Sequence, residues 1–278
     1  MSLQAQLRGG VRRFGAGAVK VAAAGFDRVS PPEPGLTILI YHRVGGGSGS
    51  AVDLPVPLFR EQMQWLAANT TVVSLDDAVS RLGDPAAGPA VVVTFDDGTS
   101  DWVDQAMPVL VEVGVPATFY VATSFVEDGR PWPRMARAVS WAGLADMAST
   151  GLATIGSHTH SHALLDRVTG DVADFELARS SGLIEERLGL ACKHFAYPKA
   201  LLGSEHAQAG VRERFVTATL AGGRTNVAGH SDLHRLSRTP LQTGDAMKWF
   251  RAKAGGGLRL EGAVRDRLDR RRYIGRSS

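Results

Sequence analysis

The sequence contains one cysteine, Cys192, among its 278 residues. An intramolecular disulfide is therefore excluded, and cysteine usage gives no indication of the redox compartment. Cys192 stands next to an apparent strand, so we expect it to be buried in the core rather than to act as a nucleophile.

Long apolar runs are also lacking, since none approaches the ~20 residues that span a bilayer. Arginines precede the Ala-rich stretch 15–26, which is the order found in a signal peptide, but Lys20 interrupts this stretch and it contains no leucine. We therefore expect an amphipathic helix that lies on a membrane or on the domain. The expected location is cytoplasmic or membrane-peripheral, and the sequence leaves export open.

Charge of one sign is scarce as well, because the formal net charge is only +3. No interleaving of basic and aromatic residues suggests a nucleic-acid surface, so we expect no nucleic-acid partner. Much of the basic excess lies at the two ends, in Arg8, Arg12, Arg13, Lys20 and Arg270 to Arg272. We expect solvated tails there, and peripheral contact with anionic lipid or an acidic polymer is the alternative. The predicted division is a basic arm at 1–34, a catalytic domain at 35–254 and a basic tail at 255–278.

Buried strands alternate with helices along the predicted domain. The apolar runs predict strands at 36–41, 90–95, 118–121, 153–155, 194–197 and 216–220. Helical spacing predicts helices at 58–68, 102–113 and 172–188, with two more starting at Ser74 and Ser140. This alternation indicates parallel β/α units, and the number of strands favours an α/β fold of the irregular, incomplete (β/α) barrel type over an open sheet.

Polar residues follow several of these strands directly. His42 follows the first strand, Asp96 and Asp97 follow the second, and His158 follows the strand at 153–155. In β/α folds the loops after the carboxyl ends of the strands carry the chemistry. These side chains are therefore the first candidates for a functional site.

Two adjacent carboxylates after an apolar strand are costly unless something compensates for their charge. A divalent cation could bind one of them and leave the other as a base. The alternative is a helix start, where aspartates accept hydrogen bonds from free backbone N–H groups.

Three of the eight histidines, His158, His160 and His162, fall within five positions. On a helix His158 and His162 would share a face, whereas on a strand all three would, so spacing alone does not identify the ligands. Two imidazoles and one carboxylate suit either an open zinc site or the facial triad of a non-haem iron oxygenase. A second acid beside the ligand counts against an oxygenase.

Together, Thr94-Phe95-Asp96-Asp97-Gly98 and Ser157-His158-Thr159 followed by His162 resemble the polysaccharide deacetylase (NodB-homology) family, carbohydrate esterase family four. The resemblance covers about 36–240 and implies an irregular (β/α) barrel. By this resemblance Asp96 is the general base, Asp97, His158 and His162 bind the metal, and His160 is a bystander. The implied metal is Zn²⁺, with Co²⁺ or Ni²⁺ as other divalent candidates.

Two further segments, Leu39 to Val44 and Phe195 to Pro198, resemble the circularly permuted poly-N-acetylglucosamine deacetylases. In that subgroup the general acid comes from the early strand, which implies His42. The family's arginine beside the base is replaced by Ala196, and we expect either that Arg238 supplies this cation or that it forms a surface ion pair. Lys199 stands where the subgroup tends to have tyrosine, and its backbone N–H would bind the oxyanion.

The resemblance implies a metal-dependent hydrolase that removes N-acetyl groups from amino sugars of a polysaccharide and releases acetate. An exopolysaccharide similar to poly-N-acetylglucosamine and a cell-wall glycan are both compatible with it. The differences at Ala196 and Lys199 motivate one alternative, a family member that binds glycans without turnover. A second alternative is a hydrolase of a different amide, as in related branches of the family.

Overall fold

The computed structural model describes residues 17–132 and 136–273, and its centre is a barrel of parallel strands. Seven strands form this closed barrel in the order β1, β4, β5, β6, β7, β8, β9, and β9 pairs back onto β1. Their bounds are β1 Leu36–Tyr41, β4 Ala90–Asp97, β5 Ala117–Val121, β6 Ala153–Ser157, β7 His194–Ala196, β8 Thr217–Ala221 and β9 Leu236–Pro240. A separate two-stranded sheet joins β2 (Arg43–Val44) and β3 (Asp53–Leu54).

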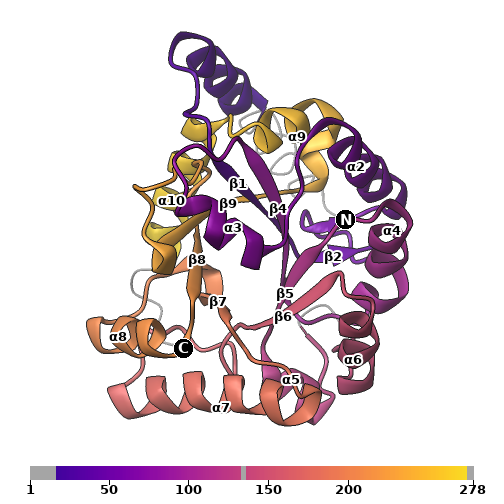
Figure 1. Cartoon of the computed structure of the whole chain (residues 1–278), viewed down its shortest axis with the longest axis vertical. Helices are drawn as coiled ribbons and strands as arrows, with labels where there is room; N and C mark the ends of the chain where they lie inside the picture. Colours follow the sequence, from indigo (N-terminus) through magenta and orange to yellow (C-terminus); the bar gives the residue numbers. More distant parts are fainter. Residues whose placement is uncertain (1–16, 133–135, 274–278) are drawn as a thin grey trace, which may run out of the picture.

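Helices surround the strands (Figure 1). They are 17–29, α2 Val56–Asn69, α3 Leu75–Leu82, α4 Met107–Val113, α5 Thr123–Asp128, α6 Trp141–Ser149, α7 Gly170–Leu188, α8 Glu205–Arg214, α9 Ala246–Ala254 and α10 Arg259–Tyr273. Local sequence sets several of their ends. Ser74 caps α3 by accepting a hydrogen bond from the Asp77 N–H, and Ser140 caps α6 in the same way from Gly143.

The apolar residues divide into an inner and an outer layer, because successive side chains of a strand point to opposite faces. The inner layer includes Ile38 and Val92, and α3 contributes Leu75 and Ala78 to it. The outer layer includes Leu39, Tyr41, Val93 and Phe95, which pack with residues of α2 and α4. Asp96 has the same parity as Val92, so its side chain belongs to the interior of the barrel.

The structure confirms the predicted (β/α) barrel and corrects details of it. The barrel closes with seven strands, so it is incomplete only relative to an eight-stranded one. Strand β4 extends through Asp96 and Asp97, which we had placed after the strand. The helix expected at 102–113 consists of a π-helical turn, Trp102–Ala106, followed by α4. Strand β9, which closes the barrel, was not predicted.

The first and the last helix of the described residues contact other parts of the protein. Lys20, on the helix at 17–29, is buried and bonded to Asp245, and Arg259 at the start of α10 pairs with Asp27. The expectation of a solvated tail is therefore wrong for Lys20. Arg8, Arg12 and Arg13 and the side chains of Arg270 to Arg272 lie outside the described residues, and the division at 34 and 254 stays a prediction.

The described residues bear on the expectations for Cys192 and for membrane-spanning segments. Cys192 is buried in the outer core, and burial raises the pKa of its thiol, as expected for a structural cysteine. None of the helices in the described part of the chain is long and apolar enough to cross a membrane.

Candidate active site

One pocket at the carboxyl ends of the barrel strands collects every residue that the sequence singled out as catalytic or metal-binding. The lining residues include His42, Asp96, Asp97, His158, His162, Lys199 and Arg238. They come from the ends of β1, β4 and β6, from the loops after β6 and β7, and from β9. Residues that are up to 196 positions apart thus meet at one end of the barrel.

Asp96 forms a buried bidentate ion pair with Arg238. The guanidinium donates from Nη1 to Oδ1 at 2.6 Å and from Nη2 to Oδ2 at 2.8 Å, and Nη1 also lies 3.1 Å from the Thr94 hydroxyl. The guanidinium stands over the ring of Tyr120 at 5.1 Å. Because Arg238 is only 1% exposed, the alternative of a surface ion pair is wrong.

This pair fixes the charge of Asp96. Burial alone would raise the pKa of the carboxyl, but Arg238, together with His158 and His42, outweighs burial and holds the pKa well below its usual range. Asp96 is therefore a carboxylate at neutral pH, and both of its oxygens are oriented by one rigid partner.

Asp97, His158 and His162 form a second, adjacent cluster. One ligand atom from each lies within 4.8 Å of the others. The Asp97 Oδ1 is 3.8 Å from His158 Nε2 and 3.6 Å from His162 Nε2. Ligands of a tetrahedral zinc ion are about 3.4 Å apart when their bonds are about 2.1 Å long, so this spacing is close to that of a metal site.

The polar atoms of this cluster suit the binding of a cation better than hydrogen bonding to one another. The His158 Nδ1 donates to the Ala196 carbonyl at 2.7 Å, so its Nε2 carries a lone pair that points toward a carboxylate. The His162 Nε2 is buried and has no hydrogen-bond partner among the described residues. Burial lowers the pKa of His158 to about 4 and that of His162 to about 3, so both imidazoles are neutral at pH 7, the form that can bind a metal.

Neighbouring groups hold the side chains of this cluster in place. The Glu176 carboxylate of α7 accepts hydrogen bonds from the backbone N–H and the hydroxyl of Ser161, which fixes the loop before His162. The rings of Trp132 and His162 pack at nearly a right angle, with their centroids 5.4 Å apart. Sequence reasoning did not identify Glu176 as a supporting residue, because a single acid on a helix gives no local signal for a contact 15 positions away.

His160 lies outside the cluster. Its Nδ1 is 2.9 Å from the Thr123 hydroxyl, and its ring packs edge-on against Phe175. The structure therefore agrees with the resemblance in grouping His162, and not His160, with His158 and Asp97.

His42 and Lys199 border the two clusters. The backbone carbonyl of His42 accepts a hydrogen bond of 2.7 Å from the Trp102 indole, and its Nδ1 is buried without a partner among the described residues. Lys199 lies in the loop after β7, with an exposed side chain and a φ of 53°.

Left-handed backbone conformations concentrate around this pocket. Asp97 has a φ of 90°, His162 of 64° and Lys199 of 53°, although none of them is a glycine. Such conformations cost about 1–3 kcal/mol each and persist only where the surrounding structure enforces them, as it commonly does at functional sites.

The fold and the pocket define a class: a (β/α) barrel that places an Asp-His-His cluster beside an ion-paired aspartate at the carboxyl ends of its strands. Residues 83–213 match the model of the polysaccharide deacetylase family. Residues 83–213 thus match a polysaccharide deacetylase domain, which confirms the resemblance found in the motifs and supports glycan deacetylation in general.

Individual relatives agree with this family. YxkH of Bacillus subtilis (strain 168), whose name assigns it provisionally to the polysaccharide deacetylases, is 26% identical over 216 residues, covering 76% of this chain and 74% of YxkH. The solved structure of IcaB from Ammonifex degensii is 25% identical with a TM-score of 0.71, covering 81% of this chain and 98% of IcaB. The Streptococcus pyogenes deacetylase PplD, solved with acetate, is 21% identical with a TM-score of 0.69, covering 80% and 99%, and shares the fold.

Proposed function

We propose that this protein removes N-acetyl groups from amino sugars of a polysaccharide by metal-assisted hydrolysis and releases acetate. One observation carries the proposal: the buried Asp96–Arg238 pair lies in the same pocket as the Asp97, His158 and His162 cluster. A carboxylate held ionised beside a set of neutral metal ligands is the arrangement that hydrolysis of an unactivated amide needs. The proposed substrate is a glycan similar to poly-N-acetylglucosamine, as an exopolysaccharide or in a cell wall.

The proposed metal ligands are Asp97, His158 and His162. A divalent cation held by them, with zinc as the first candidate, would make water acidic enough to lose a proton near neutral pH and would polarise the acetamide carbonyl. The donor set supports this choice, because two neutral imidazoles and one carboxylate suit zinc and leave room for other ligands.

Asp96 would act as the general base. Its ionised carboxylate can accept a proton from the attacking water as that water adds to the acetamide carbon. The two hydrogen bonds from Arg238 hold the carboxylate ionised and oriented, and they also make it a weak base. Asp96 therefore depends on an acidified water, which explains why it would need the neighbouring cluster.

The remaining roles fall to His42 and Lys199. The backbone N–H of Lys199 would donate to the oxyanion of the tetrahedral intermediate, a contribution typically worth about 3–4 kcal/mol for each donor. His42 would protonate the amine as the bond between carbon and nitrogen breaks, so that the products are a free amino sugar and acetate. Its place in the pocket, at the end of β1, supports this role.

Acetate release from N-acetylglucosamine oligomers by the purified, metal-analysed protein tests the proposal. We expect activity that is lost on chelation and restored by a divalent metal. Asp96→Asn should lower kcat by about 10²–10⁴-fold, the usual contribution of a general base. Asp104→Asn, at an exposed aspartate of the π-helical turn, is the control and should keep the parent rate.

Four results would contradict the proposal in different ways. Full activity of the metal-free protein would show that the reaction does not need a metal. An Asp96→Asn variant as fast as the parent would show that Asp96 is not the general base. Oligomers that bind without release of acetate would favour the non-catalytic alternative, and hydrolysis of other amides alone would move the activity to a different substrate.

A further inference from the structure

The C-terminal helix contributes a charged side chain to the active-site pocket. Arg265 of α10 lines this pocket together with Gln242, although both lie outside the segment that matches the family model. The Arg265 side chain is 23% exposed, so part of it faces solvent. It is therefore accessible to a molecule that enters the pocket.

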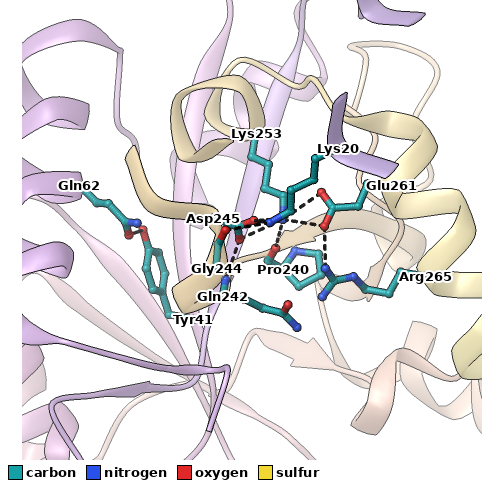
Figure 2. A network of polar contacts seen from close by, with 10 residues as sticks. All are labelled: Lys20, Tyr41, Gln62, Pro240, Gln242, Gly244, Asp245, Lys253, Glu261 and Arg265. Atoms are coloured by element: carbon teal, nitrogen blue, oxygen red, sulfur yellow. Dashed lines mark hydrogen bonds and ion pairs between the residues drawn. The ribbon is translucent and has the colours of Figure 1, made fainter. Parts of the chain in front are cut away.

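A buried ion network fixes the helix that carries Arg265 (Figure 2). Arg265 donates to the Glu261 carboxylate at 2.9 Å, and Glu261 also pairs with Lys253 at 3.3 Å. Asp245 then joins Lys253 at 3.0 Å to Lys20 of the N-terminal helix. With all members ionised, this network contains three cations and two carboxylates, so one positive charge is left over. Arg265 is its member in the pocket wall.

Carboxylates in the pocket do not compensate for this charge. Among the described residues that line it, the only carboxylates are Asp96 and Asp97. Arg238 already pairs with Asp96, and Asp97 belongs to the candidate metal cluster. Lys199 adds a second, exposed cation to the lining. The described lining therefore carries three cationic side chains and two carboxylates.

We propose that Arg265, assisted by Lys199, binds an anionic group of the polysaccharide, so that the preferred substrate is an N-acetylated glycan that carries carboxylates or phosphates. This inference rests on the proposed deacetylation and adds the substrate class to it. A guanidinium suits both groups, because its planar fork donates two parallel hydrogen bonds to neighbouring oxygens. Arg265 determines substrate specificity, because it contacts a sugar beside the one that loses its acetyl group.

Matched oligosaccharides of equal length test the inference. One set consists of N-acetylglucosamine alone, a second alternates it with glucuronic acid, and a third carries 6-phosphates. We expect KM for one anionic set to be about tenfold below that for the neutral set, with a similar kcat, and the set that gains identifies the group. Raising the salt concentration should reduce the preference, because the contact is partly exposed.

Variants of α10 separate recognition from folding. Arg265→Gln should lose the preference for the anionic set, and Arg265→Lys, which retains the charge, should restore part of it. Arg267→Gln removes an exposed arginine of the same helix and should change nothing. Equal KM values for all sets in the parent, or an equal loss on all sets in Arg265→Gln with an unchanged melting temperature, would overturn the inference.

Calorimetric binding of the same oligosaccharides distinguishes this inference from the proposed function. If no set releases acetate but the anionic set binds about tenfold more tightly through Arg265, deacetylation fails and the recognition of anionic glycans stands. If acetate is released equally from all sets, deacetylation stands and the role of Arg265 fails.

Discussion

Arg238 and Asp96 stand 142 positions apart in the sequence and form two hydrogen bonds inside the barrel. Strand pairing brings them together: β9 pairs with β1, and β1 pairs with β4. The contact thus joins the last strand of the barrel to the strand that carries both aspartates. At the position where the family has its arginine, this chain has Ala196, so the cation beside Asp96 comes from a different strand.

Removal of Arg238 should destabilise the fold, because it leaves a buried carboxylate without a partner. We expect Arg238→Met to lower the free energy of unfolding by about 3–5 kcal/mol, measured by urea denaturation. The double variant Arg238→Met with Asp96→Asn should recover much of this loss, since it no longer buries a charge. A single variant as stable as the parent, or a double variant that shows only the sum of the two losses, would contradict the pairing.

Zinc should stabilise the protein through His162 and not through His160. At about 100 times the dissociation constant a ligand adds about 2.7 kcal/mol, which a thermal melt detects readily. We expect the parent and His160→Ala to show a higher Tm with added zinc, and His162→Ala to show little change. His160 is a matched control because it is two positions away and bonds to Thr123 instead of the cluster. An equal response of both variants would refute the ligand assignment.

Much of the barrel and most of the candidate site could be predicted from the sequence. Apolar runs such as 36–41 and 90–95 are typical of buried parallel strands. Asp96, Asp97 and His158 directly follow or end such runs. Strand β9 was missed because Leu236-Ser237-Arg238-Thr239-Pro240 contains a single large apolar residue. Its burial is stabilised by the ion pair with Asp96, which depends on a strand far away in the sequence.

The roles of the two chain ends could not be predicted for the same kind of reason. Lys20 and Arg265 are charged side chains, which usually face water. Lys20 pairs with Asp245, 225 positions away, and Glu261, one helical turn before Arg265, also pairs with Lys253. Burial of the network therefore depends on how α9, α10 and the N-terminal helix pack. Composition alone gives no signal for such an arrangement.

Gly156 should be required for the close packing of β5, β6 and β7. A Cβ at this position would lie 2.7 Å from the His194 carbonyl oxygen and 2.9 Å from the Tyr120 ring. We expect Gly156→Ala to destabilise the protein by about 1–3 kcal/mol and to weaken zinc binding, because His158 is only two positions further along the chain. Gly182→Ala is the control: this exposed glycine of α7 has open space around it, and alanine should stabilise the helix by up to about 1 kcal/mol. Equal effects of the two substitutions would contradict the steric argument.

The metal-free protein should lose stability between pH 6.5 and pH 4 because of buried histidines. His194 is fully buried, and burial lowers its pKa to about 4, whereas an unfolded chain has a histidine pKa of about 6.5. Below pH 6.5 the unfolded state therefore binds a proton that the folded state does not, so the free energy of unfolding falls as the pH falls. His194 alone accounts for up to about 3 kcal/mol, and His158 and His162 add to it.

Urea denaturation of the metal-free protein across this pH range measures the effect. Aspartates with lowered pKa values, such as Asp96, lose their contribution to the free energy of unfolding only below about pH 4. They therefore do not contribute to the change between pH 6.5 and pH 4. His194→Gln can keep a hydrogen bond to Thr217, which His194 contacts at 2.9 Å, and should reduce the slope. His206→Gln, at an exposed histidine, should leave the slope unchanged. If His194→Gln shows the parent's full pH dependence, His194 is not the buried neutral group that the structure indicates.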